Sequence, residues 1–235
     1  MTTRAELMQL RSMDFRVGGL PLPSPEEVME WFSVLEAGWV HNGDPAKPHA
    51  ILHAGDHSSG FFLCKRVLGY GSLREILAMC IIAELRKVWL GDVDGVFGSP
   101  YSSLGLAFDI GRLLRTKTYV PEKGLEKGAM VFKPDDPVPA GALLLQVEEL
   151  VTTWDSGKTT AQAIVDGNPN PVKFAPFVGV LVHRPRVLDR ALLNGRTLVP
   201  FIERQVDAWK PADCPLCKQG SRAVFPKTQW AELTA

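Results

Sequence analysis

The sequence predicts an α/β protein in which helices flank a central parallel sheet. Between residues 95 and 183, short apolar segments alternate with segments of helical periodicity, which is typical of parallel strands joined by helices. With 235 residues and 46% hydrophobic composition, the chain can form one sizeable core. The segment Leu143–Thr160 predicts a strand, a polar loop and a helix, and open α/β sheets bind ligands at such strand ends.

The N-terminal third is predicted to be helical and then turn-rich. Residues Met1–Arg16 have the pattern of an amphipathic helix. Ser24 and Glu27 form a capping box, with proline at the first helical position, so a second helix is expected to run to Leu35. The polar segment His41–Ser59 is expected to form turns.

A strand and a long helix follow in the prediction. Phe61–Val67 is apolar and short enough for a strand. Ser72 and Glu75 form another capping box, which predicts a buried helix over Leu73–Val88. The polar segment Pro121–Pro139 is longer than most connections, so it is either a functional loop or a β-hairpin. The remaining elements are strands over Gly95–Gly98, Lys117–Val120, Leu143–Val147 and Phe177–His183, and helices over Ser103–Leu114 and Lys158–Asp166.

Composition excludes several classes of protein. The 26 basic and 26 acidic residues balance, whereas a nucleic-acid-binding protein normally has a basic excess. No apolar run reaches the roughly 18 residues of a membrane span. The first residues lack the apolar stretch of an export signal, so we expect a cytoplasmic protein with no nucleic-acid or membrane partner.

Two carboxylates and a polar loop form the candidate site. Glu148 and Glu149 follow the predicted strand, where they can accept hydrogen bonds from sugar hydroxyls or hold Mg²⁺ through water. On their own they would indicate a solvated strand end. The loop favours a phosphate ligand because it adds hydroxyls, Gly157 and Lys158 before a helix. It is not a Walker A loop, because Thr152 stands where that motif has its first glycine.

The segment resembles the phosphoribosyl-pyrophosphate (PRPP) motif of type I phosphoribosyltransferases, in which an acidic pair precedes a Thr/Gly/Ser loop. Other segments, in the same order along the chain, resemble the orotate phosphoribosyltransferase branch. They are His53–Phe62, Gly98–Ala107, Val178–Arg186 and the tail sequence DCPLCKQGS. The resemblance covers about residues 25–220. It implies the type I fold as a single domain over residues 1–235, with a hood from about 25–65 and part of 185–235.

The resemblance implies a role for each segment. Glu148 and Glu149 would bind the ribose hydroxyls, and Phe62 and Arg184 would form the base pocket. Lys123, Lys127 and Asp155 are the candidate catalytic residues. Binding of the 5-phosphate falls to Thr152, Thr153, Asp155, Ser156, Gly157, Lys158, Thr159 and Thr160, and binding of pyrophosphate to Ser99, Pro100, Tyr101, Ser102 and Ser103.

The chain departs from the family pattern in its phosphate loop. Trp154 and Asp155 stand at the two glycine positions if no gap is allowed, and an indole there would obstruct the ligand. With a longer loop, Asp155–Thr159 resembles the Asp-Thr-Gly-Lys-Thr loop of purine-salvage enzymes. We favour this register, because it places Gly157 where the chain turns into the helix and Asp155 near the base.

Charges expected for PRPP are also missing. The family's pyrophosphate-loop lysine aligns with Ser102, and Pro121 and Glu122 replace an Arg-Lys pair. His183 replaces the aspartate before Arg184. Lys123 and Lys127 either substitute for the missing charge or are solvated loop residues.

Cysteines and histidines give weaker signals. Cys214 and Cys217 form a Cys-x-x-Cys pair, which is half of a tetrahedral zinc site, but no second pair lies in the tail, so a turn with two reduced thiols is favoured. His53 and His57 are spaced as a metal pair but not on a predicted helix. Cys64 and Cys80 are expected in the core, and His41 and His49 in exposed loops.

The expected function is Mg²⁺-dependent phosphoribosyl transfer between PRPP and a nucleobase, by a homodimer. Mg²⁺ would be bound through PRPP, with no direct protein ligand. Arg184 favours orotate or a related pyrimidine, whereas the loop register favours a purine. The alternative is a protein of the same fold that binds PRPP or a nucleotide in a regulatory role, without turnover.

Overall fold

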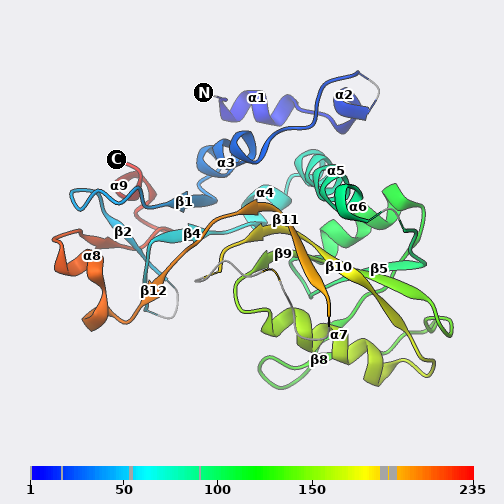
Figure 1. Ribbon diagram of the computed structural model, residues 1–235. Coiled ribbons are helices and arrows are strands. Elements are labelled where there is room, and N and C mark those ends of the chain that lie inside the picture. The colour runs from blue at the N-terminus through cyan, green and yellow to red at the C-terminus, as the bar shows by residue number, and fades with distance from the viewer. Residues whose placement is uncertain (1, 17, 53–54, 90, 186–189, 191–194) are drawn as a thin grey trace.

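A central sheet of five parallel strands organises the protein (Figure 1). The computed structural model describes residues 2–16, 18–52, 55–89, 91–185, 190 and 195–235. The strand order is β11-β10-β9-β5-β6, and each neighbouring pair is parallel. The predicted parallel sheet is therefore confirmed. The strands are β5 (Gly95–Gly98), β6 (Lys117–Thr118), β9 (Leu143–Val151), β10 (Lys173–His183) and β11 (Thr197–Glu203).

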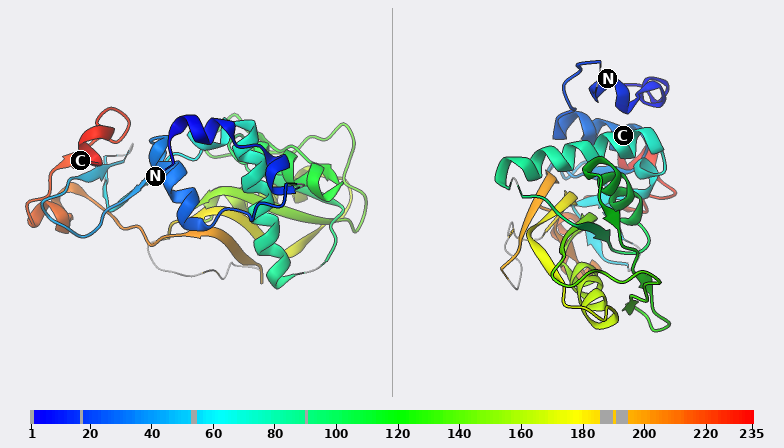
Figure 2. Two further views of the ribbon diagram at one scale, coloured as in Figure 1. Left: turned by 90° about the horizontal axis from the view of Figure 1, so that it is seen from above. Right: turned by 90° about the vertical axis from the view of Figure 1, so that its right-hand side faces the viewer.

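Helices cover both faces of this sheet (Figures 1 and 2). On one face α5 and α6 pack on the strands, with α3 and the two N-terminal helices stacked outside them, and α7 covers the other face. The helices are α1 (Arg4–Gln9), α2 (Ser12–Arg16), α3 (Pro25–Val34), α5 (Gly71–Val88), α6 (Leu104–Leu114) and α7 (Asp155–Gly167).

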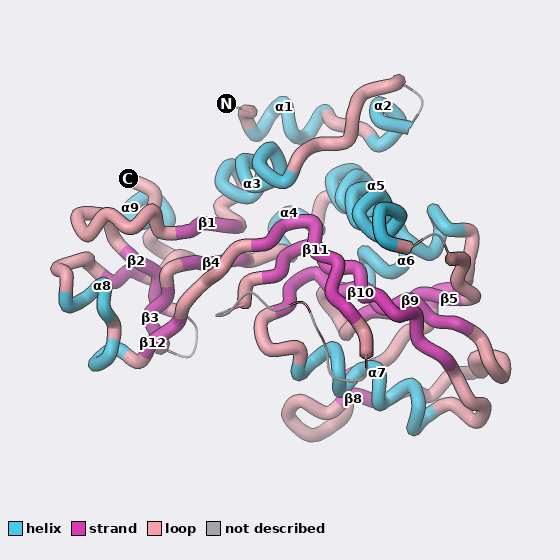
Figure 3. The backbone as a smooth tube through the Cα atoms, viewed as in Figure 1, coloured by secondary structure: helices cyan, strands magenta, loops and turns pink. Residues whose placement is uncertain are grey.

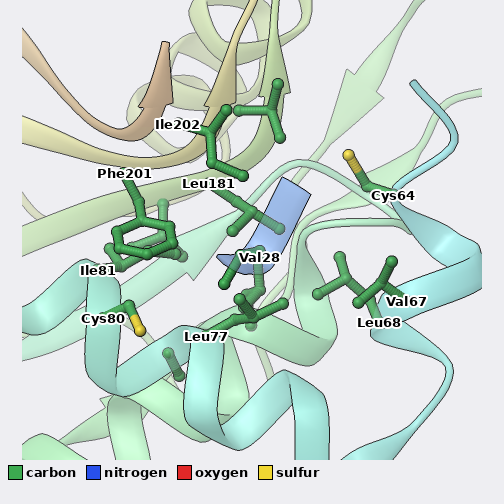
Figure 4. Packing of buried hydrophobic residues seen from close by; sticks show 14 of the residues in the cluster. Val28, Cys64, Val67, Leu68, Leu77, Cys80, Ile81, Leu181, Phe201 and Ile202 are labelled. Carbon is green, nitrogen blue, oxygen red and sulfur yellow. The ribbon is translucent and has the colours of Figure 1, made fainter. Parts of the chain in front are cut away.

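The largest core cluster lies between α5 and the sheet (Figure 4). It joins Val28 of α3 and Leu77 and Ile81 of α5 to Leu181 and Ile202 of the sheet. All five side chains are fully buried. Burying a side chain of this kind stabilises the fold by about 1.5–3 kcal/mol, so this contact holds α5 in place beneath the outer helices.

A second, smaller sheet stands apart from the first (Figure 3). Its four strands, in the order β12-β3-β2-β13, come from both halves of the sequence, and we call it the hood sheet. The antiparallel pair of β1 (Gly38–Val40) and β4 (Gly60–Phe62) lies beside it. The strands of the hood sheet are β2 (His49–Ile51), β3 (His57–Ser58), β12 (Ala208–Trp209) and β13 (Ala223–Val224). The short helices of these segments are α4 (Lys65–Leu68), the 3₁₀ turn Pro211–Asp213, α8 (Pro215–Lys218) and α9 (Trp230–Leu233).

Several predicted helices have different boundaries in the structure. The N-terminal segment forms two short helices rather than one, because the chain is extended at Leu10. The capping box of Ser24 and Glu27 is present. The predicted capping box of Ser72 and Glu75 is absent, because α5 begins at Gly71 and Ser72 therefore lies inside the helix. Glu75 instead forms an ion pair with Arg112 at 2.9 Å.

The predicted strands differ in length. Strand β9 extends to Val151 and so contains the acidic pair that was expected after it, and β10 begins four residues earlier than predicted. The expected strand Phe61–Val67 is wrong beyond Phe62, where the chain turns into α4. In Pro121–Pro139, β7 (Glu122–Lys123) pairs antiparallel with β8 (Met130–Val131), so the hairpin alternative is correct.

The exposure of the histidines and cysteines also tests the sequence interpretation. Cys64 and Cys80 are buried, as expected. His49 was expected in an exposed loop, but it is fully buried in β2, because the hood sheet and the tail cover it. His53 lies outside the described residues. Within the described part of the chain, no helix has the length and apolarity needed to cross a membrane.

At Gly179 of β10, side chains of α5 pack close against the sheet backbone. A Cβ atom there would lie 2.7 Å from Cγ2 of Ile81 and 3.1 Å from Cδ1 of Leu85. Gly179→Ala should therefore overpack the core and lower the free energy of unfolding by about 1–3 kcal/mol, measured by urea denaturation.

Gly71→Ala is the matched control, because a Cβ at this first residue of α5 meets no atom within 4 Å. It should leave stability unchanged or raise it by up to about 1 kcal/mol. Equal effects of the two substitutions would contradict the packing argument.

Candidate active site

The candidate site lies at the carboxyl ends of β5 and β9, which are neighbours in the sheet. After β5 the chain makes the short loop Ser99–Ser103 before α6, and the peptide bond between Pro100 and Tyr101 is cis. Ser99 and Ser103 are buried, whereas Tyr101 and Ser102 are exposed. Glu148 and Glu149 lie near the carboxyl end of β9, so the two strands bring the serine hydroxyls and the two carboxyl groups together.

Glu148 is buried, and both of its carboxyl oxygens have hydrogen-bonding partners. Its Oε1 accepts hydrogen bonds from Ser99 Oγ at 2.7 Å and from Gln146 Nε2 at 2.8 Å. Its Oε2 lies 2.8 Å from Ser103 Oγ. The side chain is 3% exposed, so a ligand can reach it only by displacing these partners.

Ser103 lies between the two carboxyl groups and cannot satisfy both as a donor. Its Oγ contacts Glu148 Oε2 and Glu149 Oε2, and it accepts a hydrogen bond from the Glu149 backbone N–H at 3.2 Å. A hydroxyl has one proton to donate, so one carboxyl group must be protonated for all contacts to be hydrogen bonds. Burial, together with the charge of Glu149, raises the pKa of Glu148 to about 7, so Glu148 keeps its proton to a higher pH than an ordinary carboxyl group.

Gln146 and Arg196 extend this network beneath the site. Arg196 Nη1 donates to Gln146 Oε1 at 2.9 Å, and Gln146 Nε2 donates to the Gly157 carbonyl at 2.9 Å as well as to Glu148. Burial lowers the pKa of Arg196. The sequence analysis missed both residues. Gln146 had a signal, since it is a polar residue inside an apolar strand, two positions before Glu148 and so on the same face.

Helix α7 begins a few residues after the carboxyl end of β9, which holds Glu148 and Glu149. The chain turns at Trp154, which has φ 72° and ψ 0°, and the first helical bond runs from the Lys158 N–H to the Trp154 carbonyl. The N–H groups of Asp155, Ser156 and Gly157 precede this bond and have no acceptor within the helix. They line a pocket together with Glu149, so the helix start offers donors and a partial positive charge for an anion.

The register expected for the phosphate loop is partly wrong. Asp155–Thr160 form the first turns of α7, and the turn into the helix is made at Trp154 rather than at Gly157. Thr159 and Thr160 donate their hydroxyls to carbonyls of the helix itself, at 2.9 and 2.8 Å. The pocket beside Glu149 is therefore lined by the loop Thr152–Trp154 and the first residues of the helix.

The indole of Trp154 has a defined place beside this pocket. It packs against Gly157, where a Cβ would lie 2.4 Å from the ring, and against a buried cluster that includes Val178 and Leu198. The Arg196 guanidinium lies 5.4 Å from the ring centroid. Gly157 is thus required by the indole rather than by a turn, and the ring is held toward β10 and β11.

One of the two candidate lysines lies near the pyrophosphate loop. Lys123 of the β7–β8 hairpin places its Nζ 5.4 Å from the ring centroid of Tyr101. Lys127, in the turn of the same hairpin, is exposed. The fold therefore brings a positive charge from residue 123 to the loop Ser99–Ser103.

A second pocket joins Phe62 and Arg184, as the sequence analysis predicted. Arg184 follows β10, and the pocket is also lined by Leu52, Phe61 and Phe225. The buried Nε of Arg184 has no hydrogen-bond partner, and burial lowers the pKa of this guanidinium. An unpartnered buried donor beside aromatic rings is suited to a planar, negatively charged ligand.

Asp155 and His183 lie outside the pocket of Phe62 and Arg184. Asp155 lines the pocket at the start of α7, where it accepts a hydrogen bond from Thr153 Oγ1 at 2.6 Å. His183 is buried and pairs with Glu203 at 2.9 Å, within the sheet. Neither residue is among those that line the pocket of Phe62 and Arg184.

Comparison with known proteins places the chain in a family. No protein-family model matches it. It is 28% identical over 205 residues to an orotate phosphoribosyltransferase of Thermoanaerobacter sp. (strain X514), covering 86% of this chain and 96% of the relative. It is 30% identical over 183 residues to an orotate phosphoribosyltransferase of Heliobacterium modesticaldum, covering 76% and 88%. The chain belongs to the orotate phosphoribosyltransferase family.

Solved structures show that this family member has the type I phosphoribosyltransferase fold. The crystal structure of orotate phosphoribosyltransferase from Aeropyrum pernix matches with a TM-score of 0.56 at 17% identity, covering 75% of this chain and 93% of that one. A phosphoribosyltransferase from Corynebacterium diphtheriae gives 0.53 at 16% identity, covering 76% and 95%. UMP synthase of Leishmania donovani gives 0.57 at 17% identity over 77% of this chain, which spans 36% of that protein. The predicted family and fold are confirmed, and phosphoribosyltransferases are a class of glycosyltransferase.

The raised pKa of Glu148 in this phosphoribosyltransferase predicts a pH-dependent stability. Between its ordinary value of 4.5 and about 7, the unfolded chain has lost this proton while the folded chain keeps it. Folding then becomes less favourable as pH rises through this window. Glu148→Gln retains an amide donor for Ser103 without a titrating proton. Its stability relative to wild type should therefore rise by up to about 2–3 kcal/mol from pH 4.5 to pH 8, measured by urea denaturation.

Glu232→Gln, at an exposed ion pair with Arg222, serves as the control and should shift stability by less than about 1 kcal/mol at either pH. A difference between Glu148→Gln and wild type that does not change with pH would refute the assignment of the proton to Glu148.

Proposed function

We propose that this protein transfers the 5-phosphoribosyl group from PRPP to orotate. A ring nitrogen of the base loses its proton to solvent and forms a bond to C1 of the ribose, the bond from C1 to pyrophosphate breaks, and pyrophosphate leaves with the bonding electron pair. The protein's contribution is to hold the two reactants in line and to place charges where they develop.

The surroundings of Arg184 are the main reason for choosing orotate as the base. Its Nε is buried without a hydrogen-bond partner, in a pocket where Phe62 offers an aromatic face. A buried cation without an anion is unfavourable, and a planar carboxylate would satisfy it by a charge-assisted hydrogen bond. A pyrimidine that carries a carboxylate therefore fits this pocket better than an uncharged base.

The start of α7 supports the binding of the 5-phosphate. The N–H groups of Asp155, Ser156 and Gly157 and the hydroxyls of Thr152 and Thr153 surround the same pocket. In this proposal Glu149 meets the ribose hydroxyls. Glu148 stays within the protein and positions Ser99 and Ser103, which refines the role expected for the acidic pair.

The loop after β5 supports the binding of pyrophosphate. Ser102 and Tyr101 are exposed there, and Lys123 brings a positive charge to the loop. Mg²⁺ prefers oxygen ligands, and in this proposal the oxygens of PRPP supply them, with no direct protein ligand. When bound with PRPP, Mg²⁺ would neutralise charge on the departing pyrophosphate. We include a homodimer and a cytoplasmic location in the proposal, and light scattering tests the dimer.

A steady-state assay tests this function. The purified chain is incubated with PRPP, Mg²⁺ and either orotate, uracil, adenine or hypoxanthine, and pyrophosphate release is measured. We expect release with orotate and at least about tenfold less with the other bases, because only orotate has a carboxylate for Arg184. No turnover with any base, together with PRPP binding by calorimetry, would instead establish the regulatory binding protein.

Arg184→Met separates a binding role from a structural one. Methionine fills similar space without a buried charge, so the free energy of unfolding should stay constant or rise by about 1–2 kcal/mol. Loss of the charged contact should lower kcat/KM for orotate about 10²–10³-fold. The Kd for PRPP should change less than about threefold, since the two pockets are lined by different residues.

Arg66→Met is the matched control, because Arg66 pairs with Glu36 at the surface. It should leave kcat/KM within about twofold and stability within about 1 kcal/mol. A large loss of stability in Arg184→Met would show that Arg184 acts structurally.

A further inference from the structure

Two histidines and two cysteines converge inside the hood. His49 and His57 come from β2 and β3, and Cys214 and Cys217 from the start and end of α8. Their side chains each offer one nitrogen or sulfur atom, and these four atoms all lie within 4.8 Å of one another. His49 and Cys214 are separated by 165 residues in the sequence but are both fully buried here.

The distances match the edges of a small tetrahedron. Nε2 of His49 lies 3.0 Å from Nδ1 of His57, and 3.5 Å from Sγ of both Cys214 and Cys217. Nδ1 of His57 lies 3.2 Å from Sγ of Cys217. Bond lengths of about 2.0–2.1 Å to nitrogen and 2.3 Å to sulfur give tetrahedral edges of roughly 3.3 Å between nitrogens and roughly 3.6 Å between nitrogen and sulfur. The four atoms are thus placed as ligands of one ion.

A second layer of hydrogen bonds sets the His49 tautomer. Ser221 Oγ donates its proton to the Lys47 carbonyl at 2.6 Å, so it must accept from His49 Nδ1–H at 2.8 Å. Nε2 of His49 then has no proton, and its lone pair faces the other three ligand atoms. Bound histidines in metal sites are oriented by this kind of contact, from the nitrogen that does not touch the metal.

The cluster joins parts of the hood that have little other support. The apolar cluster of the hood has four buried residues, Ala50, Phe61, Val224 and Leu233, with Trp39, Leu52, Leu63 and Trp230 packed against them at its edge. So small a core contributes little stability, and units of this size commonly need a metal or a disulfide. The described cysteines are free thiols. A metal ion here would connect the β2–β3 pair to α8 in the tail.

We propose that His49, His57, Cys214 and Cys217 bind one structural Zn²⁺ ion. Two imidazoles and two thiolates suit a borderline-soft ion, and they would not suit Mg²⁺ or Ca²⁺, which take oxygen ligands. Four protein ligands leave no open position for a substrate, so the role is to hold the hood together. The site is separate from the proposed transfer reaction, and its test does not depend on activity.

Metal content of the purified chain is the first test. The protein is prepared without added metal or chelator, and zinc is measured by mass spectrometry. We expect about one Zn²⁺ per chain in the wild type and at least about fivefold less in Cys217→Ser and in His57→Gln. Cys80→Ser and His41→Gln are the controls, because Cys80 is buried in another core and His41 lies in an exposed loop. Both should keep the full zinc content.

Cobalt substitution of the wild-type chain is the second test, and it does not depend on the folding of any variant. Zinc is removed with a chelator under reducing conditions, and Co²⁺ is added. Visible bands of tetrahedral Co²⁺ and a near-ultraviolet thiolate-to-cobalt band should appear at one equivalent and vanish when Zn²⁺ is added. Zn²⁺ should also slow proteolysis of the tail after residue 204 by at least about tenfold.

Three results would overturn the proposal. One is a wild-type chain without zinc that gives no tetrahedral cobalt spectrum. Another is a full zinc content in both Cys217→Ser and His57→Gln. The third is a Cys214–Cys217 disulfide in protein purified under reducing conditions. Loss of zinc from Cys80→Ser or His41→Gln would equally count against it, because these residues lie outside the cluster.

Discussion

The buried carboxyl of Glu148 is the contact on which the arrangement of the site depends. It connects Ser99 and Ser103 after β5 to Gln146 in β9, and Gln146 in turn holds the first turn of α7 through the Gly157 carbonyl. Each of these partners would be an unsatisfied buried polar group without the others, which is costly. The network therefore fixes the spacing between the loop that we assign to pyrophosphate and the helix that we assign to the 5-phosphate. Because burial raises the pKa of Glu148, a proton on this carboxyl group would reduce the repulsion between the two adjacent acidic side chains.

The two pockets that we assign to the substrate lie in two different parts of the fold. The pocket at α7 has backbone donors and hydroxyls on the central sheet, and the pocket of Arg184 lies between that sheet and the hood. In the proposed function, backbone groups on the central sheet bind phosphate and side chains of the hood bind the base, so the orientation of the hood would determine how well the base pocket forms. A metal ion in the hood would stabilise that orientation from a distance, without touching a substrate.

Much of the fold could be predicted from the sequence, because it depends on local patterns. The alternation of strands and helices predicted the parallel sheet, and the capping box at Ser24 predicted a helix start. The departures came from tertiary contacts. Strand β9 continues through the acidic pair because Ser99 and Ser103 accommodate Glu148, and α7 begins early because Trp154 adopts a left-handed conformation that its sequence does not suggest. Arg184 and Phe62 were paired correctly through family resemblance, whereas Arg196 and the buried position of His49 depend on contacts between residues far apart in the chain.

The hood sheet has a consequence for the order in which the protein can fold during synthesis. Strand β2 pairs with β13, and the pocket of Arg184 is lined by residues 225–227 as well as by residues 51–52. The ribosome makes the chain from its N-terminus, so the central sheet is complete in sequence once Glu203 has emerged, but β2 still lacks a neighbour. For the last part of synthesis the nascent chain would have its central sheet assembled, while the hood still presents an open strand edge at β2. This interval is when chaperone contact or mispairing with another nascent chain would matter most.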